Sequence, residues 1–288
     1  MEAVYAIIEA CLSILTSLLT VFITVGFFVR SKENPFLIVS LPLAVLFLSF
    51  LLSALVFIFV SVILILLATG MIENSPKHTV MLVLSLIIGH SIATFCDLAS
   101  VGVFVQRIVN LLFPLKVFRR SNQAIVAFVV VVSLIASSFT FYFNLQSYKI
   151  ADPPFREGCY AFNCLDSLGL PGRTANLIVR CTGALSMIVS GCLFVAVYRR
   201  TKLQNKSIKE TNLNKFVKCM FLLRSVMVLT YYIPEYIVKK TIGVNLSDFI
   251  GPYVMLLASI DGFLSMFVYC CIVIKNKKKV VVVSLANF

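Results

Sequence analysis

Long apolar stretches dominate the sequence and restrict the folds open to this chain more than any other feature. A helix needs about 20 residues to cross the roughly 30 Å hydrocarbon core of a bilayer, because in lipid each backbone amide must bond within its own segment. With 60% hydrophobic and 13% charged residues, the chain is too apolar for a soluble domain. We therefore predict an all-α membrane protein, a single bundle of seven transmembrane helices within residues 1–288. The predicted spans are residues 4–29, 36–66, 79–109, 123–145, 175–198, 216–238 and 251–274.

Two of these stretches need a closer look. Residues 4–29 could instead be a signal peptide, but they lack a basic leader and have no clear cleavage site before Arg30, so we predict a span. The apolar run of the second stretch, extended to Thr69, would measure about 50 Å as one straight helix. It must tilt, project or end early, and Pro42 offers a bend.

The positive charges alternate between the loops. Seventeen Lys and Arg residues fall within residues 30–32, 107–120, 199–218 and 275–279, whereas six fall in the alternate loops. Since cationic loops near span ends are retained in the cytosol, we predict an amino terminus outside the cell and a cytosolic carboxyl terminus. The net charge of +13 then reports orientation, and we expect no nucleic-acid partner.

Three ionisable residues fall at similar depths inside the predicted spans. Asp97 lies ten residues, about 15 Å, outward from Arg107, and Arg224 lies about 12 Å from the inner end of its span, with Asp261 at a comparable depth. An unpaired charge in a span costs several kcal/mol, on the order of 3, so each is a candidate functional residue. We predict that Arg224 pairs with Asp97, Asp261 or both. A structural ion pair that only fixes helix register is the competing interpretation.

A second candidate pair lies nearer the outer surface, where Arg180 and Glu235 fall in neighbouring spans. His90, two turns outward of Asp97, could contact a ligand or simply bond to a neighbouring helix. No catalytic motif accompanies these residues, so we do not expect an enzyme.

The longer outer loop contains Cys159 and Cys164 on the predicted oxidising side of the membrane. They could form a local disulfide or remain free thiols. No His lies near them, so we expect no metal site and no cofactor. Asn245 begins a glycosylation sequon close to the last span, where we doubt that it is used.

The end of the third span carries a specific pattern. Gln106-Arg107-Ile108 is followed by Pro114-Leu115, which resembles the D-R-Y and downstream P-L of the rhodopsin-like G-protein-coupled receptors. Gln106 replaces the acid and Ile108 the tyrosine.

Three further motifs carry the same resemblance in eroded form. Tyr231-Tyr232-Ile233-Pro234 resembles C-W-x-P. Residues 265–269 stand in the place of N-P-x-x-Y and retain only its tyrosine, Tyr269. Residues 43–47 resemble L-A-x-x-D with Phe47 in place of the acid, which puts a sodium site of the usual kind in doubt. Asp261 followed eight residues on by Tyr269 is similar to the nematode serpentine chemoreceptors, the Srbc class among them.

The resemblance implies a chemosensory receptor in the plasma membrane, and the membrane of a sensory cilium is one location that fits such a receptor. It would bind a small odorant or pheromone and activate a heterotrimeric G protein as the sixth span swings outward, with membrane lipid around it. A small polytopic transporter or channel is the alternative, although we find no inverted repeat. The ligand-binding residues would be His90, Arg180, Tyr232, Glu235 and Tyr236, and the activation switch Arg107, Pro114, Pro234 and Tyr269.

Overall fold

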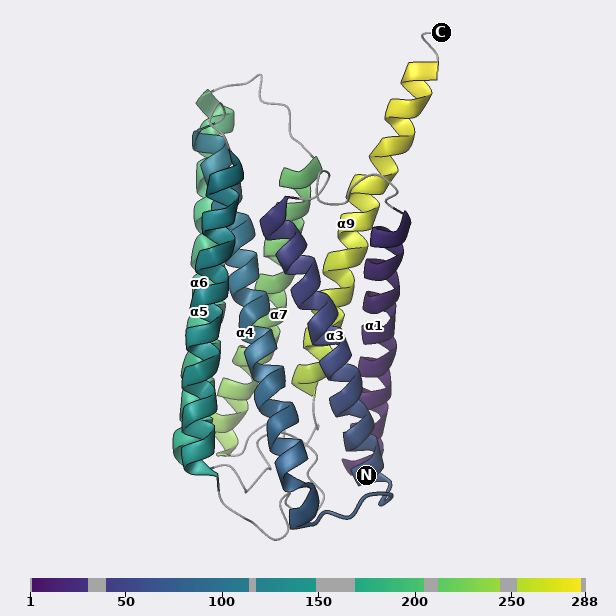
Figure 1. Cartoon of the computed structure of the whole chain (residues 1–288), viewed down its shortest axis with the longest axis vertical. Coiled ribbons are helices and arrows are strands. Elements are labelled where there is room, and N and C mark those ends of the chain that lie inside the picture. Colours follow the sequence, from purple (N-terminus) through teal and green to yellow (C-terminus); the bar gives the residue numbers. More distant parts are fainter. Residues whose placement is uncertain are drawn as a thin grey trace.

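Seven long helices run alternately up and down in the computed structural model (Figure 1), which describes residues 2–30, 40–113, 118–148, 169–204, 212–243 and 253–285. These residues include no strand. Because the helices alternate in direction, the two termini lie at opposite ends of the bundle. The helices are α1 (Glu2–Arg30), α3 (Leu41–Ala68), α4 (Pro76–Leu112), α5 (Phe118–Ser147), α6 (Leu170–Gln204), α7 (Asn212–Ile242) and α9 (Tyr253–Leu285).

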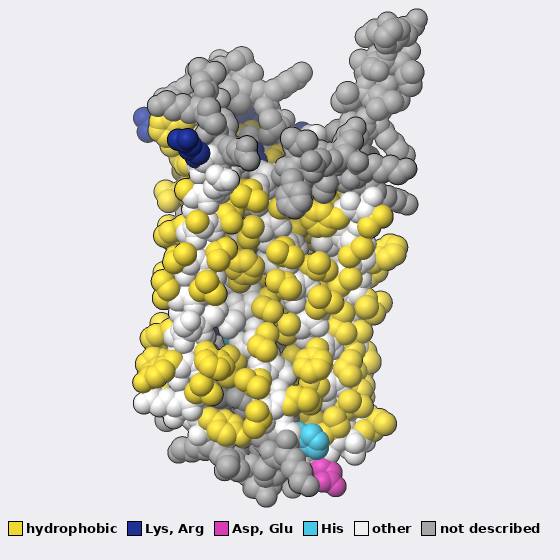
Figure 2. All heavy atoms as spheres, in the orientation of Figure 1, with side chains coloured by type: hydrophobic (Ala, Val, Ile, Leu, Met, Phe, Trp, Pro, Cys, Tyr) yellow, Lys and Arg dark blue, Asp and Glu magenta, His cyan; other side chains and the backbone are white. Residues whose placement is uncertain are grey.

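Six helices contain a described segment long and apolar enough to cross a membrane, and the chain is therefore an integral membrane protein. Figure 2 shows the apolar side chains that cover the middle of the bundle. The seventh helix, α7, is not among the six, and its first half carries Lys215, Lys218 and Arg224. The six segments are Ala3–Val29, Leu41–Ala68, Ile87–Leu112, Arg120–Ser147, Thr174–Leu203 and Met255–Ile272.

Pro42 starts a helix instead of bending one. Helix α3 begins at Leu41, after Ser40, and Pro42 lies in its first turn. A proline is tolerated there because the backbone N–H of that position has no partner within the helix anyway. The expected bend at Pro42 is therefore wrong. Helix α3 has 28 residues and is about 42 Å long, so the expectation that it tilts or projects from the hydrocarbon core stays a prediction.

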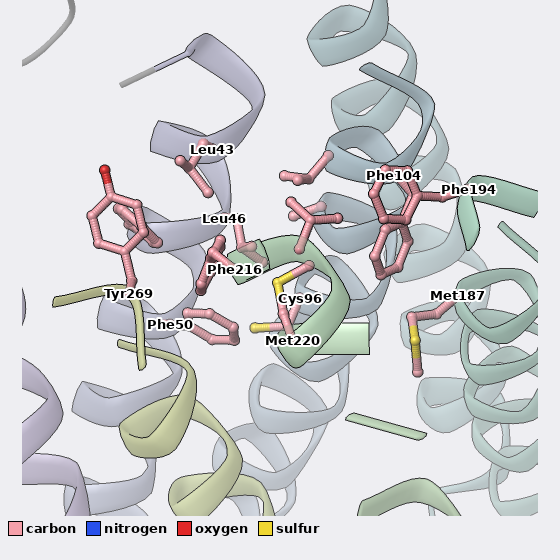
Figure 3. Close-up of a cluster of buried hydrophobic side chains, with 14 of the residues drawn as sticks. Leu43, Leu46, Phe50, Cys96, Phe104, Met187, Phe194, Phe216, Met220 and Tyr269 are labelled. Atoms are coloured by element: carbon pink, nitrogen blue, oxygen red, sulfur yellow. The ribbon is translucent and has the colours of Figure 1, made fainter. Parts of the chain in front are cut away.

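Aromatic side chains fill the core in the half of the bundle nearer the carboxyl terminus. Phe104 of α4 stacks on Phe194 of α6 with ring centroids 6.2 Å apart (Figure 3). Tyr269 of α9 is almost fully buried, and its ring lies 5.1 Å from that of Phe216 of α7 and 4.6 Å from that of Phe47 of α3. Edge-to-face contacts of this kind favour one mutual orientation of the helices, so the cluster holds α3, α7 and α9 together.

Polar side chains join α5 to α6 at the opposite end. Asn144 and Asn176 exchange two amide hydrogen bonds of 2.9 and 3.1 Å, and both residues are buried. One turn further along, Ser147 Oγ accepts a hydrogen bond from the backbone N–H of Gly172 at 3.1 Å. Since these side chains are buried away from water, each of them finds a hydrogen-bond partner on the neighbouring helix.

Candidate functional site

Arg224 of α7 forms ion pairs with both acidic residues that the sequence placed at its depth. Its Nη2 atom lies 2.8 Å from Asp97 Oδ1 on α4, and its Nε atom lies 3.1 Å from Asp261 Oδ2 on α9. The three residues are only 6%, 8% and 7% exposed. One guanidinium group thus connects three helices inside the bundle.

The remaining donors of Arg224 bind α4. Nη1 donates to the backbone carbonyl of Cys96 at 2.9 Å and to the hydroxyl of Ser100. The guanidinium group also lies 5.7 Å from the ring centroid of Phe50 on α3. A buried arginine is stable only when its donors are satisfied, and four of the five N–H groups of Arg224 are bonded here.

Helix α6 approaches Asp97 through a glycine. A Cβ atom at Gly183 would lie 3.4 Å from Asp97 Oδ2, so the absence of a side chain leaves room for the carboxylate. Arg180 lies three residues earlier on α6, nearly one turn away. The sequence argument did not identify Gly183, Phe50 or Ser100. Of these, Ser100 could have been found, since it lies three residues after Asp97 and shares its helix face.

A cavity of about 80 Å³ lies beside the ion pairs. The charged residues that line it are Asp97, Asp261, Arg224 and Arg180, so the described lining contains two positive and two negative side chains. Apolar side chains from α3, α7 and α9, among them Phe57, form the rest of the wall. The arrangement is suited to a small molecule with an apolar body and one polar group.

The other predicted ligand-binding residues are placed differently. His90 Nδ1 lies 3.3 Å from Arg180 Nη1, yet His90 does not line the cavity. Tyr236 is 65% exposed with Lys240 Nζ 5.8 Å from its ring centroid, and it does not line the cavity either. The side chains of Tyr232 and Glu235 lie outside the part of the molecule that is described.

At the basic end of the bundle, Gln106 bonds to neighbouring helices. Its Oε1 atom accepts a hydrogen bond of 2.8 Å from Ser40 Oγ, and its Nε2 atom donates one of 2.9 Å to Asn122 Oδ1. The residue in the acid position of the D-R-Y-like motif thus links the start of α3 and of α5 to α4. Arg107 is half-buried beside it, and its Nε atom has no hydrogen-bond partner among the described residues.

Two of the remaining switch residues lie in regular structure. Pro234 lies inside α7, ten residues or about 15 Å along the helix from Arg224. Tyr269 belongs to the aromatic cluster described above, where Phe47 packs on it in the position of the motif acid. Pro114, Cys159, Cys164 and Asn245 lie outside the described residues.

Within the described ranges, no group of three or more His, Cys, Asp or Glu side chains is arranged to hold a metal ion. The site is therefore characterised by its ion pairs and its cavity. No family model matches the chain, and no curated protein matches it either.

Proposed function

We propose that the protein is a seven-span chemosensory receptor of the plasma membrane that binds a small extracellular ligand and activates a heterotrimeric G protein. The observation that carries this proposal is the Arg224 ion-pair network. It joins α7 to α4 and α9 beside a cavity, so that a ligand in the cavity could bias the position of α7. The D-R-Y-like and C-W-x-P-like motifs support the same function.

The charge distribution supports the orientation. Basic side chains lie at the corresponding ends of three helices, at Arg120 on α5, Arg199, Arg200 and Lys202 on α6, and Lys215 on α7. Figure 2 shows basic side chains, in dark blue, at the upper end of the bundle. The positive-inside rule assigns this end to the cytosol. In this proposal α7 is the seventh crossing helix, because its central arginine is neutralised by two carboxylates within the bundle.

The mechanism is a population shift of α7. This helix packs mainly on α9 and makes only small contacts with α4 and α6. Pro234 removes one backbone hydrogen bond and so creates a hinge between the outer part of α7 and Arg224. A ligand would have to supply about 5.5 kcal/mol of differential affinity to move the equilibrium from 1:99 to 99:1. Breaking one buried ion pair costs about 3 to 5 kcal/mol, so a ligand that rearranges these pairs could supply a differential affinity of this size.

The test is G-protein coupling in transfected cells, measured as resonance energy transfer between G-protein subunits in the absence of added ligand. We expect Arg107→Ala to abolish coupling, because Arg107 borders the inner cleft that α7 would open. Arg200→Ala removes an exposed cation from the same end and is the matched control, which should couple like the wild type. Both variants are compared at equal surface expression.

Two results would contradict the receptor function. Equal coupling by Arg107→Ala and Arg200→Ala would show that Arg107 has no special part in it. A whole-cell current that depends on the protein and persists without G protein would instead favour the channel alternative, in which the buried charges line a conduction path.

A further inference from the structure

One buried acceptor in the ion-pair network lacks a donor. Asp261 is 7% exposed, and its Oδ2 atom is bonded to Arg224 Nε. Its Oδ1 atom is buried and has no hydrogen-bond partner in the described part of the chain. A buried carboxylate oxygen without a donor is unfavourable, because it has lost its hydration and gained nothing in return.

Arg224 does not remedy this deficit. Four of its five N–H groups are bonded to Asp97, Asp261, Cys96 and Ser100. Its charge is also shared between two carboxylates, so Asp261 is only partly neutralised. The other cation in the described lining of the cavity is Arg180, which lies on α6 and forms no ion pair with Asp261 that the structure describes.

The space beside Asp261 is large enough for a ligand. Asp261 lines the cavity of about 80 Å³ and gives it a charged wall. Phe57, Met227 and Leu257 give the same cavity apolar walls. A cavity of roughly 10 to 15 Å³ measured with a water-sized probe holds one water molecule, so this cavity has room for a small molecule such as a chain of about three carbons with one polar head.

From this geometry we infer that the cavity binds a small molecule with a hydrogen-bond donor at one end, an ammonium or a hydroxyl group, which donates to the carboxylate of Asp261. The apolar part of the molecule lies against Phe57, Met227 and Leu257. Of the predicted ligand-binding residues, Arg180 lines this cavity, whereas His90 does not. This site adds to the proposed function the chemical class of the ligand.

The experiment measures the thermal transition of the purified full-length chain in lipid nanodiscs with three probes of equal length: n-propylamine, 1-propanol and propionate. We expect the two donors to raise the transition temperature by about 2 °C or more at saturation, and propionate to leave it unchanged. The relative size of the first two shifts distinguishes an ammonium from a hydroxyl ligand.

A pair of Ala→Leu variants separates the cavity from effects on the bilayer. Ala258→Leu fills the cavity without removing a charge and should abolish both shifts, whereas Ala127→Leu adds the same side chain to an exposed position of α5 and should retain them. If Ala258→Leu does not fold, Ala184→Leu fills the same cavity from α6.

The inference is overturned if no donor probe shifts the transition, if propionate shifts it equally, or if the filled variant keeps the shifts. Its failure and that of the receptor function are distinguishable, because binding is measured without a G protein. Binding without coupling would leave the inference standing and remove the function. Coupling without binding of either donor would do the reverse.

Discussion

Arg224 illustrates how a single residue in a membrane helix depends on residues far away in sequence. The residue is 6% exposed, and its guanidinium group is neutralised by Asp97, 127 positions earlier, and by Asp261 on α9. A buried pair of charges contributes little net stability against apolar residues of similar size, whereas one uncompensated charge is strongly destabilising. We therefore expect the loss of one charge from this network to destabilise the protein much more than the loss of all three charges.

This difference yields a prediction for stability. We expect Arg224→Leu alone to lower the free energy of unfolding by about 3 to 5 kcal/mol, because it leaves two buried carboxylates uncompensated. The triple variant Asp97→Asn, Arg224→Leu, Asp261→Asn should be more stable than the single variant, since no buried charge remains. Denaturant titration of the solubilised protein measures both. A triple variant less stable than Arg224→Leu would show that the charges stabilise the fold by more than mutual neutralisation.

The contact between α6 and α7 shows how one position controls the approach of two elements. The ring of Phe221 on α7 lies directly against the backbone of Gly191, so closely that a Cβ atom there would overlap it. The same ring lies 5.9 Å from that of Phe104 on α4 in an edge-to-face arrangement. Because α7 has few other contacts with α6, this ring is an important part of its attachment to that helix.

We predict that Gly191→Ala destabilises the protein by about 1 to 3 kcal/mol, since Phe221 must move away from both α6 and Phe104. Gly26→Ala is the control, because nothing lies within 4 Å of a Cβ atom at that position. Alanine should there be neutral or stabilising by up to about 1 kcal/mol, as expected for a helix interior. Thermal unfolding compares the two, and equal effects would contradict the packing argument.

At the scale of the whole molecule, the odd number of long helices places the termini at opposite ends of the bundle (Figure 1). If all seven helices cross the membrane, the termini lie in different compartments. In that case we expect the carboxyl terminus in the cytosol, because the basic side chains cluster at its end of the bundle.

We therefore predict that an epitope tag at the amino terminus is labelled by antibody on intact cells, whereas a tag at the carboxyl terminus is labelled only after permeabilisation. The prediction is contradicted if antibody labels both tags under the same condition. That outcome would mean that α7, with its three cations in the first half, does not cross.

The sequence by itself determined the helices of this protein. In lipid, backbone hydrogen bonds are made within each segment, so the length and apolarity of a stretch are enough to predict a helix. All seven predicted spans fall largely within α1, α3, α4, α5, α6, α7 and α9. The depth argument could also bring Asp97, Arg224 and Asp261 to one level, because position along a helix is proportional to residue number.

Only the tertiary structure decided which groups at a given level meet. Depth is a local property, whereas the neighbours of a helix and its rotation depend on packing against other helices. Arg180 therefore contacts His90, and Gln106 bonds to Ser40 and Asn122, although spacing along the chain did not indicate these contacts. The cavity and the unbonded oxygen of Asp261 depend on the same packing, since side chains of five helices, α3, α4, α6, α7 and α9, together line the cavity.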